Sequence, residues 1–152
     1  ERELIAVMSE LNRTAAEKAA DFKISACTDI TGFGLLGHLS EMIGSSNLTA
    51  VISAEKVPLM EGARKLAASG AVPGGTTSNL DYISGLVKWG ARVSGTDRII
   101  LCDAQTSGGL LLSVPAGRAR ELESRLKEAG ISAAAIIGEI TSGPRGIEVT
   151  KG

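Results

Sequence analysis

The sequence predicts an α+β fold, a layered domain in which helices cover a mixed β-sheet. Stretches of helical and of strand period interleave along the chain, without the strict alternation of a doubly wound sheet. The length of 152 residues suits one domain with one hydrophobic core, and the chain has no internal repeat or low-complexity segment. We therefore expect a single domain over residues 1–152.

The first 44 residues predict helix, strand, turn and helix. Apolar residues at helical spacing, with no Gly or Pro, predict an amphipathic helix over residues 3–20. The short apolar run 23–27 predicts a strand that ends at Thr28 and Asp29. From Gly34 a second apolar stripe of helical period runs to Gly44, which is a suitable helix end.

In the middle of the chain, turn-forming residues indicate where the helices and strands begin and end. Residues 48–53 predict a strand, and Pro58 is placed to open a helix that runs to Gly70. The stretch VPGGTTSN, residues 72–79, predicts a loop, and residues 82–89 have the spacing of a short helix.

The last third predicts strand, helix and two strands. Residues 110–114 form the first of these strands, and Pro115 opens a helix that Gly130 ends. Residues 133–140 and 147–149 predict the last two strands, joined by the turn TSGPRG.

Composition excludes two classes of partner. Sixteen basic and seventeen acidic residues, interspersed along the chain, give a net charge of −1 and no basic face for nucleic acid. Four aromatic residues are too few to stack single-stranded bases. No apolar run approaches the roughly 20 residues that span a bilayer, and nothing near Glu1 resembles a signal peptide. We expect a cytoplasmic protein without nucleic-acid or membrane partners, cut from a longer chain because it starts with Glu1.

The spacing of the two cysteines indicates neither a metal site nor a disulfide. Cys27 and Cys102 lie far apart, without a CxxC motif or a histidine at metal spacing, and each follows an apolar stretch. We expect both to be buried, reduced thiols.

The segment CTDITGFGLLGH, residues 27–38, carries the most chemistry. Asp29 ends a strand, and Thr31, Gly32 and Gly34 precede a helix whose first amides and dipole suit a phosphate group. A carboxylate beside a phosphate suits Mg²⁺, which prefers hard oxygen ligands and takes few of them from protein. The alternative is that Asp29 or Thr31 merely caps the helix and the glycines serve a tight turn.

Three other features have weaker functional signals. His38, the single histidine, is expected to be a boundary residue hydrogen-bonded to backbone, in preference to a proton-transfer role. The segments 105–109 (QTSGG) and 74–79 (GGTTSN) offer hydroxyls and flexible backbone, which suit either an anion contact or a packing requirement. The sequence contains no Walker lysine motif, HExxH motif or nucleophile elbow.

Several stretches together resemble the selenophosphate synthetases (selenide, water dikinases). They are CTDITGFGLLGH at 27–38, VPGGTTSN at 72–79, LCDAQTSGGLLLSVP at 101–115 and, more weakly, LNRTAAE at 11–17. TGFG alone would indicate only the wider aminoimidazole-ribonucleotide synthetase-related superfamily, whereas the third stretch indicates the selenium branch. Ala104 departs from the family, which usually has Pro there, and this affects only a local turn.

The resemblance implies the carboxyl-terminal domain of an enzyme that makes selenophosphate, AMP and phosphate from ATP, selenide and water with Mg²⁺. It implies that ATP is bound mainly by an amino-terminal domain absent from this chain, and that no catalytic nucleophile is present here. It also implies that Asp29 matches a metal-binding aspartate at the interdomain cleft and that the full-length protein is a homodimer. The backbone at Thr31, Gly32 and Gly34 beside Asp29 is the candidate phosphate contact. The alternatives are a kinase or maturation factor of the same fold, or a non-catalytic binding module.

Overall fold

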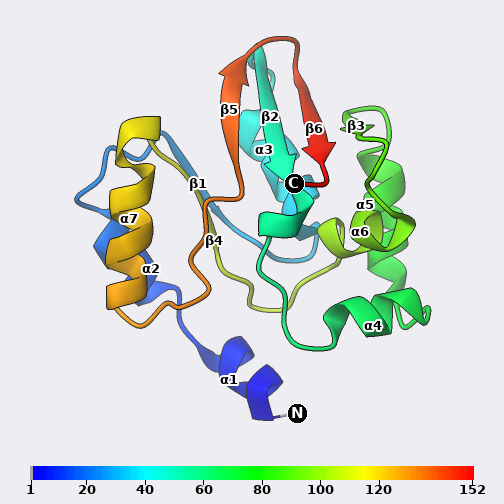
Figure 1. Cartoon of the computed structure of the whole chain (residues 1–152), viewed down its shortest axis with the longest axis horizontal. Coiled ribbons are helices and arrows are strands. Elements are labelled where there is room, and N and C mark those ends of the chain that lie inside the picture. Colours follow the sequence, from blue (N-terminus) through cyan, green and yellow to red (C-terminus); the bar gives the residue numbers. More distant parts are fainter. Residues whose placement is uncertain (1) are drawn as a thin grey trace.

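The structure is a computed structural model that describes residues 2–152, with side chains described from Leu4 onward. Its elements interleave as expected for an α+β domain (Figure 1). The helices are α1 (Arg2–Ser9), α2 (Arg13–Ala19), α3 (Gly34–Ile43), α4 (Ala63–Ala68), α5 (Gly74–Tyr82), α6 (Gly95–Leu101) and α7 (Ala116–Glu128), and a 3₁₀ turn covers Ala54–Lys56. The strands are β1 (Ala26–Asp29), β2 (Leu48–Ser53), β3 (Val87–Trp89), β4 (Leu110–Ser113), β5 (Gly138–Ser142) and β6 (Gly146–Thr150).

The strands form two sheets, one of them mixed. The larger sheet has the order β3-β6-β2-β5, in which β2 pairs with β6 in parallel and with β5 antiparallel. The smaller sheet pairs β1 with β4 antiparallel, from Ala26 opposite Ser113 to Asp29 opposite Leu110. The mixed sheet covered by helices is therefore confirmed, and a separate two-stranded sheet is added to it.

Two hydrophobic clusters hold the layers together. In the larger one, Leu36 and Leu39 of α3 are buried together with Ala50, Ile147 and Val149 of the sheet. Helix α3 lies behind the strands of the larger sheet in Figure 1. The smaller cluster lies between α2 and α7, where Ala19, Phe22, Leu122 and Leu126 are buried. Each fully buried Leu, Ile, Val or Phe of these clusters contributes about 1.5–3 kcal/mol by burial.

The elements with the strongest periodicity and end signals are confirmed. Helix α3 covers Gly34–Ile43 and ends at Gly44, whose φ of 52° is a conformation that favours glycine. Strands β2 and β4 and helix α7 also lie where they were expected. Gly130, with a φ of 93°, follows the end of α7.

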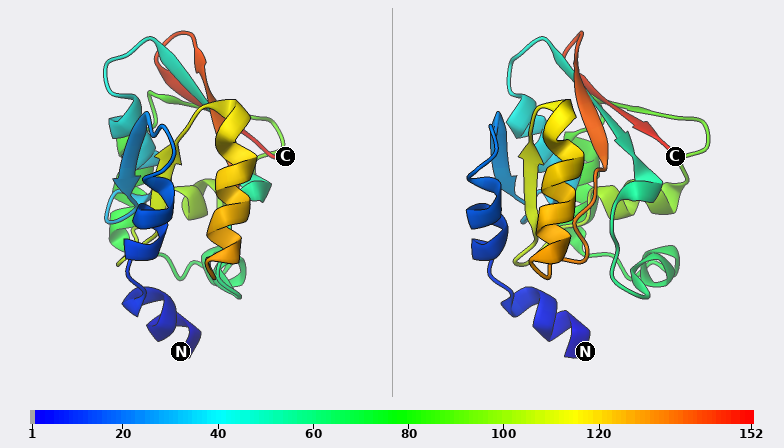
Figure 2. Two further views of the ribbon diagram at one scale, coloured as in Figure 1. Left: turned by 90° about the vertical axis from the view of Figure 1, so that its left-hand side faces the viewer. Right: turned by 60° about the vertical axis from the view of Figure 1, so that its left-hand side comes forward.

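The single helix expected over residues 3–20 is wrong, because the chain breaks into α1 and α2. The side chain of Asn12 donates a hydrogen bond to the Gly108 carbonyl oxygen at 2.9 Å, which ties the break to a distant segment. Helix α1 extends away from the body of the domain (Figures 1 and 2). Its apolar residues Leu4, Ile5, Val7 and Met8 are exposed, so its stripe contacts no core of this domain.

Further differences concern element type in the middle of the chain. Residues 74–82 form helix α5 instead of the expected loop, and the expected helix at 82–89 is a turn followed by β3. The helix expected from Pro58 begins only at Ala63, and α6 was not expected at all. Strand β1 is displaced toward Asp29, and β5 begins at Gly138, later than expected. No helix among residues 2–152 is long and apolar enough to cross a membrane.

Candidate functional site

Three segments far apart in sequence meet at the start of α3. They are the loop 30–34, the first turns of α5 and the segment 102–109. The side chain of Asn79, which is buried on α5, donates to the Gly32 carbonyl at 2.8 Å and to the Cys102 carbonyl at 3.0 Å. One amide group therefore connects all three segments, and we call this meeting point the Asn79 junction.

A second set of bonds fixes the segment after α6 to α5. The Thr76 hydroxyl, which is buried, donates to the Asp103 carboxylate at 2.7 Å and accepts from the Ala104 amide at 3.2 Å. The Gln105 side chain donates to the other Asp103 carboxylate oxygen at 2.9 Å. Both oxygens of Asp103 thus have partners within the chain, so this carboxylate serves structure here.

Backbone hydrogen bonds connect the loop 30–34 to the segment 105–109. The Thr31 carbonyl accepts from the Gln105 amide at 3.0 Å, and Ile30 exchanges bonds with Gly108 and Gly109 at 3.1 and 2.9 Å. These bonds continue the β1–β4 pairing beyond its last register pair. The segment 105–109 therefore holds the loop 30–34 in place through backbone hydrogen bonds, as a neighbouring strand would.

Two glycines permit this close approach. Gly34 has a φ of 67°, and a Cβ there would lie 2.6 Å from the carbonyl carbon of Cys102. A Cβ on Gly108 would overlap the carbonyl oxygen of Ile30. Backbone contacts as close as these exclude any side chain, so these glycines of TGFG and TSGG are required by packing.

Asp29 lies at the end of β1 and is exposed. Its carboxylate makes no hydrogen bond or ion pair with the part of the chain that the structure describes. Helix α3 has Phe33 as its N-cap and no side-chain cap bond, so neither Asp29 nor Thr31 caps it. The capping interpretation of Asp29 is therefore wrong, and its oxygens are free to bind a ligand.

Asp29 cannot hold a metal ion by itself. Within residues 2–152 no three His, Cys, Asp or Glu side chains converge on one point. Mg²⁺ is often held by only one or two carboxylates together with phosphate oxygens and water. An exposed, unpaired carboxylate fits one position of such a site, and the remaining ligands would have to come from outside this chain.

The three predicted phosphate contacts differ in what they offer. The amide of Gly34 donates to the Thr31 carbonyl at 3.0 Å, and the residue is buried. Gly32 is exposed, and its amide donates to no acceptor in the described chain. The Thr31 amide also donates to no acceptor in the described chain, but Thr31 is half-buried. Because Gly32 is exposed and its carbonyl is fixed by Asn79, its amide is the best placed of the three to meet an anion.

His38 is buried, whereas a boundary position was expected, and its ring contacts side chains instead of backbone. Its Nε2 lies 3.0 Å from the Thr31 hydroxyl, and its Nδ1 lies 3.2 Å from the Glu41 carboxylate. The Phe33 ring, 5.6 Å away, covers the imidazole, and Phe33 itself stacks at 6.4 Å on Tyr82. Phe33 and Tyr82 are both largely exposed, so their rings face solvent next to the Asn79 junction.

Sequence reasoning missed the positioning side chains Thr76, Asn79 and Asp103. All three lie inside stretches that carried the family resemblance, and that resemblance was the available signal. Their roles depend on α5, which the glycine-rich sequence concealed.

The two thiols differ, which corrects the expectation that both are buried. Cys102 is buried, and burial raises the pKa of its thiol to about 12. Cys27 is exposed because alternate side chains of β1 face away from the core.

The largest charge network lies away from the junction, at Asp97. Its buried carboxylate accepts from Ser94 at 2.6 Å, from Arg64 at 2.5 Å and from Lys151 at 3.1 Å. Burial alone would raise the pKa of Asp97, but these hydrogen bonds outweigh it and hold that pKa well below its usual range. The network joins α4, α6 and the end of the chain, which is a structural role.

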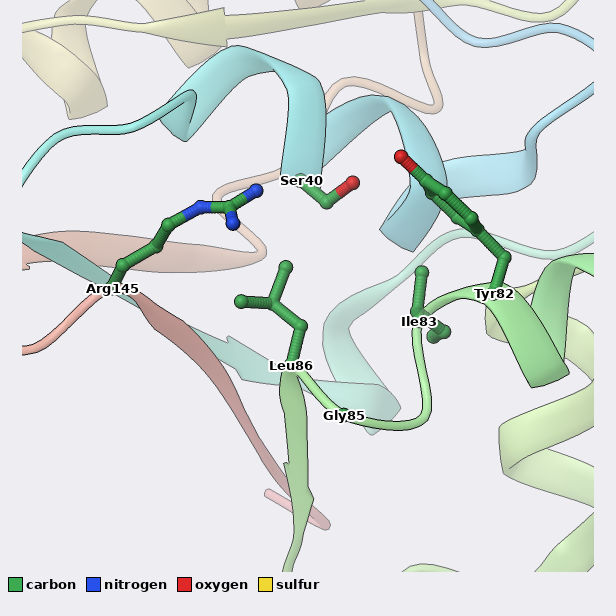
Figure 3. A pocket seen from close by; sticks show the side chains of 6 residues that line it. All are labelled: Ser40, Tyr82, Ile83, Gly85, Leu86 and Arg145. Atoms are coloured by element: carbon green, nitrogen blue, oxygen red, sulfur yellow. The ribbon is translucent and has the colours of Figure 1, made fainter.

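A shallow depression of about 270 Å³ opens beside α3 and α5 (Figure 3). Its floor is Ile83, Gly85 and Leu86, and the guanidinium of Arg145 and the hydroxyls of Ser40 and Tyr82 lie around it. The Ser40 hydroxyl already donates to the Gly37 carbonyl at 2.7 Å. None of the predicted site residues lines this depression, so we do not place the functional site there.

The fold and the Asn79 junction define an α+β domain with a glycine-rich, carboxylate-bearing loop. Residues 1–151 match the family described as AIR synthase related protein, C-terminal domain, and the chain belongs to that family.

Curated relatives sharpen this assignment. The chain is 44% identical over 147 residues to a selenide, water dikinase of Myxococcus xanthus, covering 95% of this chain and 42% of the relative. It is 46% identical over 137 residues to a selenide, water dikinase of Pelobacter propionicus, covering 90% and 39%. The chain therefore spans about two fifths of the length of these relatives.

Solved structures support the fold alone. A crystal structure of hydrogenase maturation protein HypE has a TM-score of 0.63 at 21% identity, covering 89% of this chain and 35% of that one. The E. coli HypE structure has a TM-score of 0.64 at 16% identity, covering 97% and 40%.

Proposed function

We propose that this chain is the carboxyl-terminal domain of a selenide, water dikinase, an enzyme that makes selenophosphate, AMP and phosphate from ATP, selenide and water. The observation that carries the proposal is the Asn79 junction. The three stretches that resemble selenophosphate synthetases contact one another there through side-chain and backbone bonds, although Asn79 and Gly32, for example, are 47 positions apart in sequence. Relatives of this name match over nearly the whole chain.

Within that enzyme, Asp29 supplies one oxygen ligand to Mg²⁺. Its exposed carboxylate without an internal partner supports this role. Mg²⁺ neutralises charge on transferring phosphates when it is bound. The Gly32 amide, beside the start of α3, contacts a phosphate oxygen, with the backbone of Thr31 and Gly34 shaping the loop around it.

The rest of the site belongs to an amino-terminal domain that binds ATP. The need for further metal ligands outside residues 2–152 supports this division of labour. We propose that the complete enzyme is a cytoplasmic homodimer with selenide, ATP and water as substrates. The isolated chain folds as one domain and does not turn over ATP.

The test is Asp29→Asn in the longer protein that contains this domain. Loss of a metal-binding carboxylate should lower turnover about a hundredfold or more. The free energy of unfolding should change by less than about 0.5 kcal/mol, because Asp29 is exposed and unpaired. The measurement is selenide-dependent AMP release over a Mg²⁺ titration, together with urea denaturation.

Glu139→Gln is the matched control, since Glu139 is an exposed carboxylate on β5, away from the junction. Near-normal turnover and an unchanged Mg²⁺ requirement for Asp29→Asn would remove the metal role. If the unmutated longer protein forms no AMP in response to selenide, a small-molecule kinase or maturation factor of the same fold is favoured instead.

A further inference from the structure

Three side chains beside the loop 30–34 lie in a continuous row, in which His38 is at ion-pair distance from Glu41 and at hydrogen-bond distance from Thr31. Glu41 Oε2 lies 3.2 Å from His38 Nδ1, and His38 Nε2 lies 3.0 Å from the Thr31 hydroxyl oxygen. His38 is only 8% exposed, whereas Glu41 is exposed and Thr31 is half-buried. The row thus runs from solvent through a buried imidazole to a residue two positions from Asp29.

The chemistry of the row fixes the direction of each bond. An ionised carboxylate has no hydrogen to donate and repels a ring lone pair, so the Glu41 oxygen 3.2 Å from Nδ1 favours a hydrogen on that nitrogen of His38. In the neutral ring the other nitrogen, Nε2, then carries a lone pair and must accept from the Thr31 hydroxyl. A hydroxyl has a single hydrogen, and here it is used internally.

We propose that His38 is a positioning residue that, held by Glu41, turns the Thr31 hydroxyl so that it presents only acceptor lone pairs to the ligand. Such an oxygen cannot donate to a phosphate. It can accept from a donor, and the donor that suits this place is a water molecule bound to a divalent cation. This inference rests on the proposed function, in which Asp29 binds that cation from the same loop.

The loop then offers two kinds of group to a ligand, a hydrogen-bond donor and a pair of acceptors. The Gly32 amide is a donor and suits a phosphate oxygen, while Asp29 and the Thr31 hydroxyl are acceptors and suit a hydrated cation. The Thr31 carbonyl takes no part, because it already accepts from Gly34 and Gln105. His38 acts on the ligand only through Thr31.

The first test reads the tautomer directly in this chain. His38 is the only histidine, so ¹⁵N-labelled histidine gives one unambiguous set of long-range ¹H–¹⁵N correlations. We expect the ring hydrogen on Nδ1 and a lone pair on Nε2. Glu41→Gln keeps an acceptor and should keep this pattern, whereas Glu41→Leu removes the acceptor and should shift the hydrogen to Nε2. A native ring with its hydrogen on Nε2, or a charged ring, overturns the proposal.

The second test measures the Mg²⁺ requirement in the longer protein. Thr31→Val removes the hydroxyl at nearly constant volume and should raise the Mg²⁺ concentration for half-maximal activity about tenfold, the size of one lost hydrogen bond. Thr31→Ser restores the hydroxyl and should give a clearly smaller rise. Equal effects of Val and Ser, or a rise in KM for ATP with no change in the Mg²⁺ requirement, overturn the proposal.

The two tests separate this inference from the proposed function. A longer protein without selenide-dependent AMP release refutes the function, while the tautomer of His38 still decides which way the Thr31 hydroxyl points. An active enzyme whose His38 carries its hydrogen on Nε2 refutes the positioning role and leaves the function standing.

Discussion

Asn79→Ala should destabilise the domain by about 2–3 kcal/mol, because one side chain satisfies two backbone carbonyls. The Cys102 carbonyl is in a buried bond, and leaving it unsatisfied costs about 1–3 kcal/mol. The Gly32 carbonyl is only partly buried, so water can replace its partner and the loss is about 0.5–1 kcal/mol. For a domain of this length the sum corresponds to a melting temperature lower by about 5–10 °C.

Urea denaturation followed by the fluorescence of Trp89, the single tryptophan, measures this change. Asn79→Asp keeps the shape but places a carboxylate oxygen against two carbonyl oxygens, so it should be at least as damaging as Ala. Ser78→Ala, which alters an exposed neighbour on the same helix, should change stability by less than about 0.5 kcal/mol. A loss below about 0.5 kcal/mol for Asn79→Ala, or a native-like Asn79→Asp, would refute the role of this amide.

Three other predictions concern stability and reactivity. The pKa of Asp97 is lower in the folded chain, so its contribution to stability is complete above its unfolded pKa of about 3.9 and is lost as the pH falls below that value. Urea unfolding between pH 2.5 and 7, a range chosen as roughly spanning this window, measures the change. The free energy of unfolding should fall less steeply with acid in Asp97→Asn than in the unmutated chain. Gly108→Ala should cost about 1–3 kcal/mol in thermal or urea unfolding through overlap with Ile30, whereas Gly109→Ala, with open space around it, should be nearly neutral. A thiol reagent should label Cys27 in the folded chain and Cys102 only on unfolding; rapid labelling of both would contradict the burial of Cys102.

The sequence correctly predicted the helices and strands whose local residue pattern is sufficient to specify them. Helix α3 has a continuous apolar stripe and a glycine at its end, and α7 follows a proline and also ends before a glycine. Strands β2 and β4 are rich in apolar residues that the core buries. Local sequence and tertiary packing agree at these places, so periodicity was sufficient.

Helix α5 was missed because its sequence opposes it. GGTTSN has two glycines and three hydroxyl residues, which favour turns over helix. The helix is held by contacts with distant segments, through Thr76 to Asp103 and Asn79 to Cys102. Such contacts cannot be inferred from periodicity.

Helix α6 did have a local signal. Ser94 and Asp97 form a capping box in which each side chain accepts from the backbone of the other, and the sequence SGTD displays this spacing. At the site, Asp29 and the glycine-rich loop were predicted from local chemistry, whereas the contacts of His38 with Thr31 and Glu41 depend on the folded helix.

The long spans between partners at the Asn79 junction bear on when the site forms during folding. The bond from Asn12 to Gly108 closes 96 residues, the bond from Asn79 to Gly32 closes 47, and β1 pairs with β4 from Ala26 to Ser113. Closing loops of this length is entropically costly and slows folding relative to helical bundles. During synthesis, the loop that carries Asp29 therefore remains without its partner segment 105–109 and without β4 until these residues have left the ribosome. A chain truncated before that segment contains the ligand-binding sequence without the complete site.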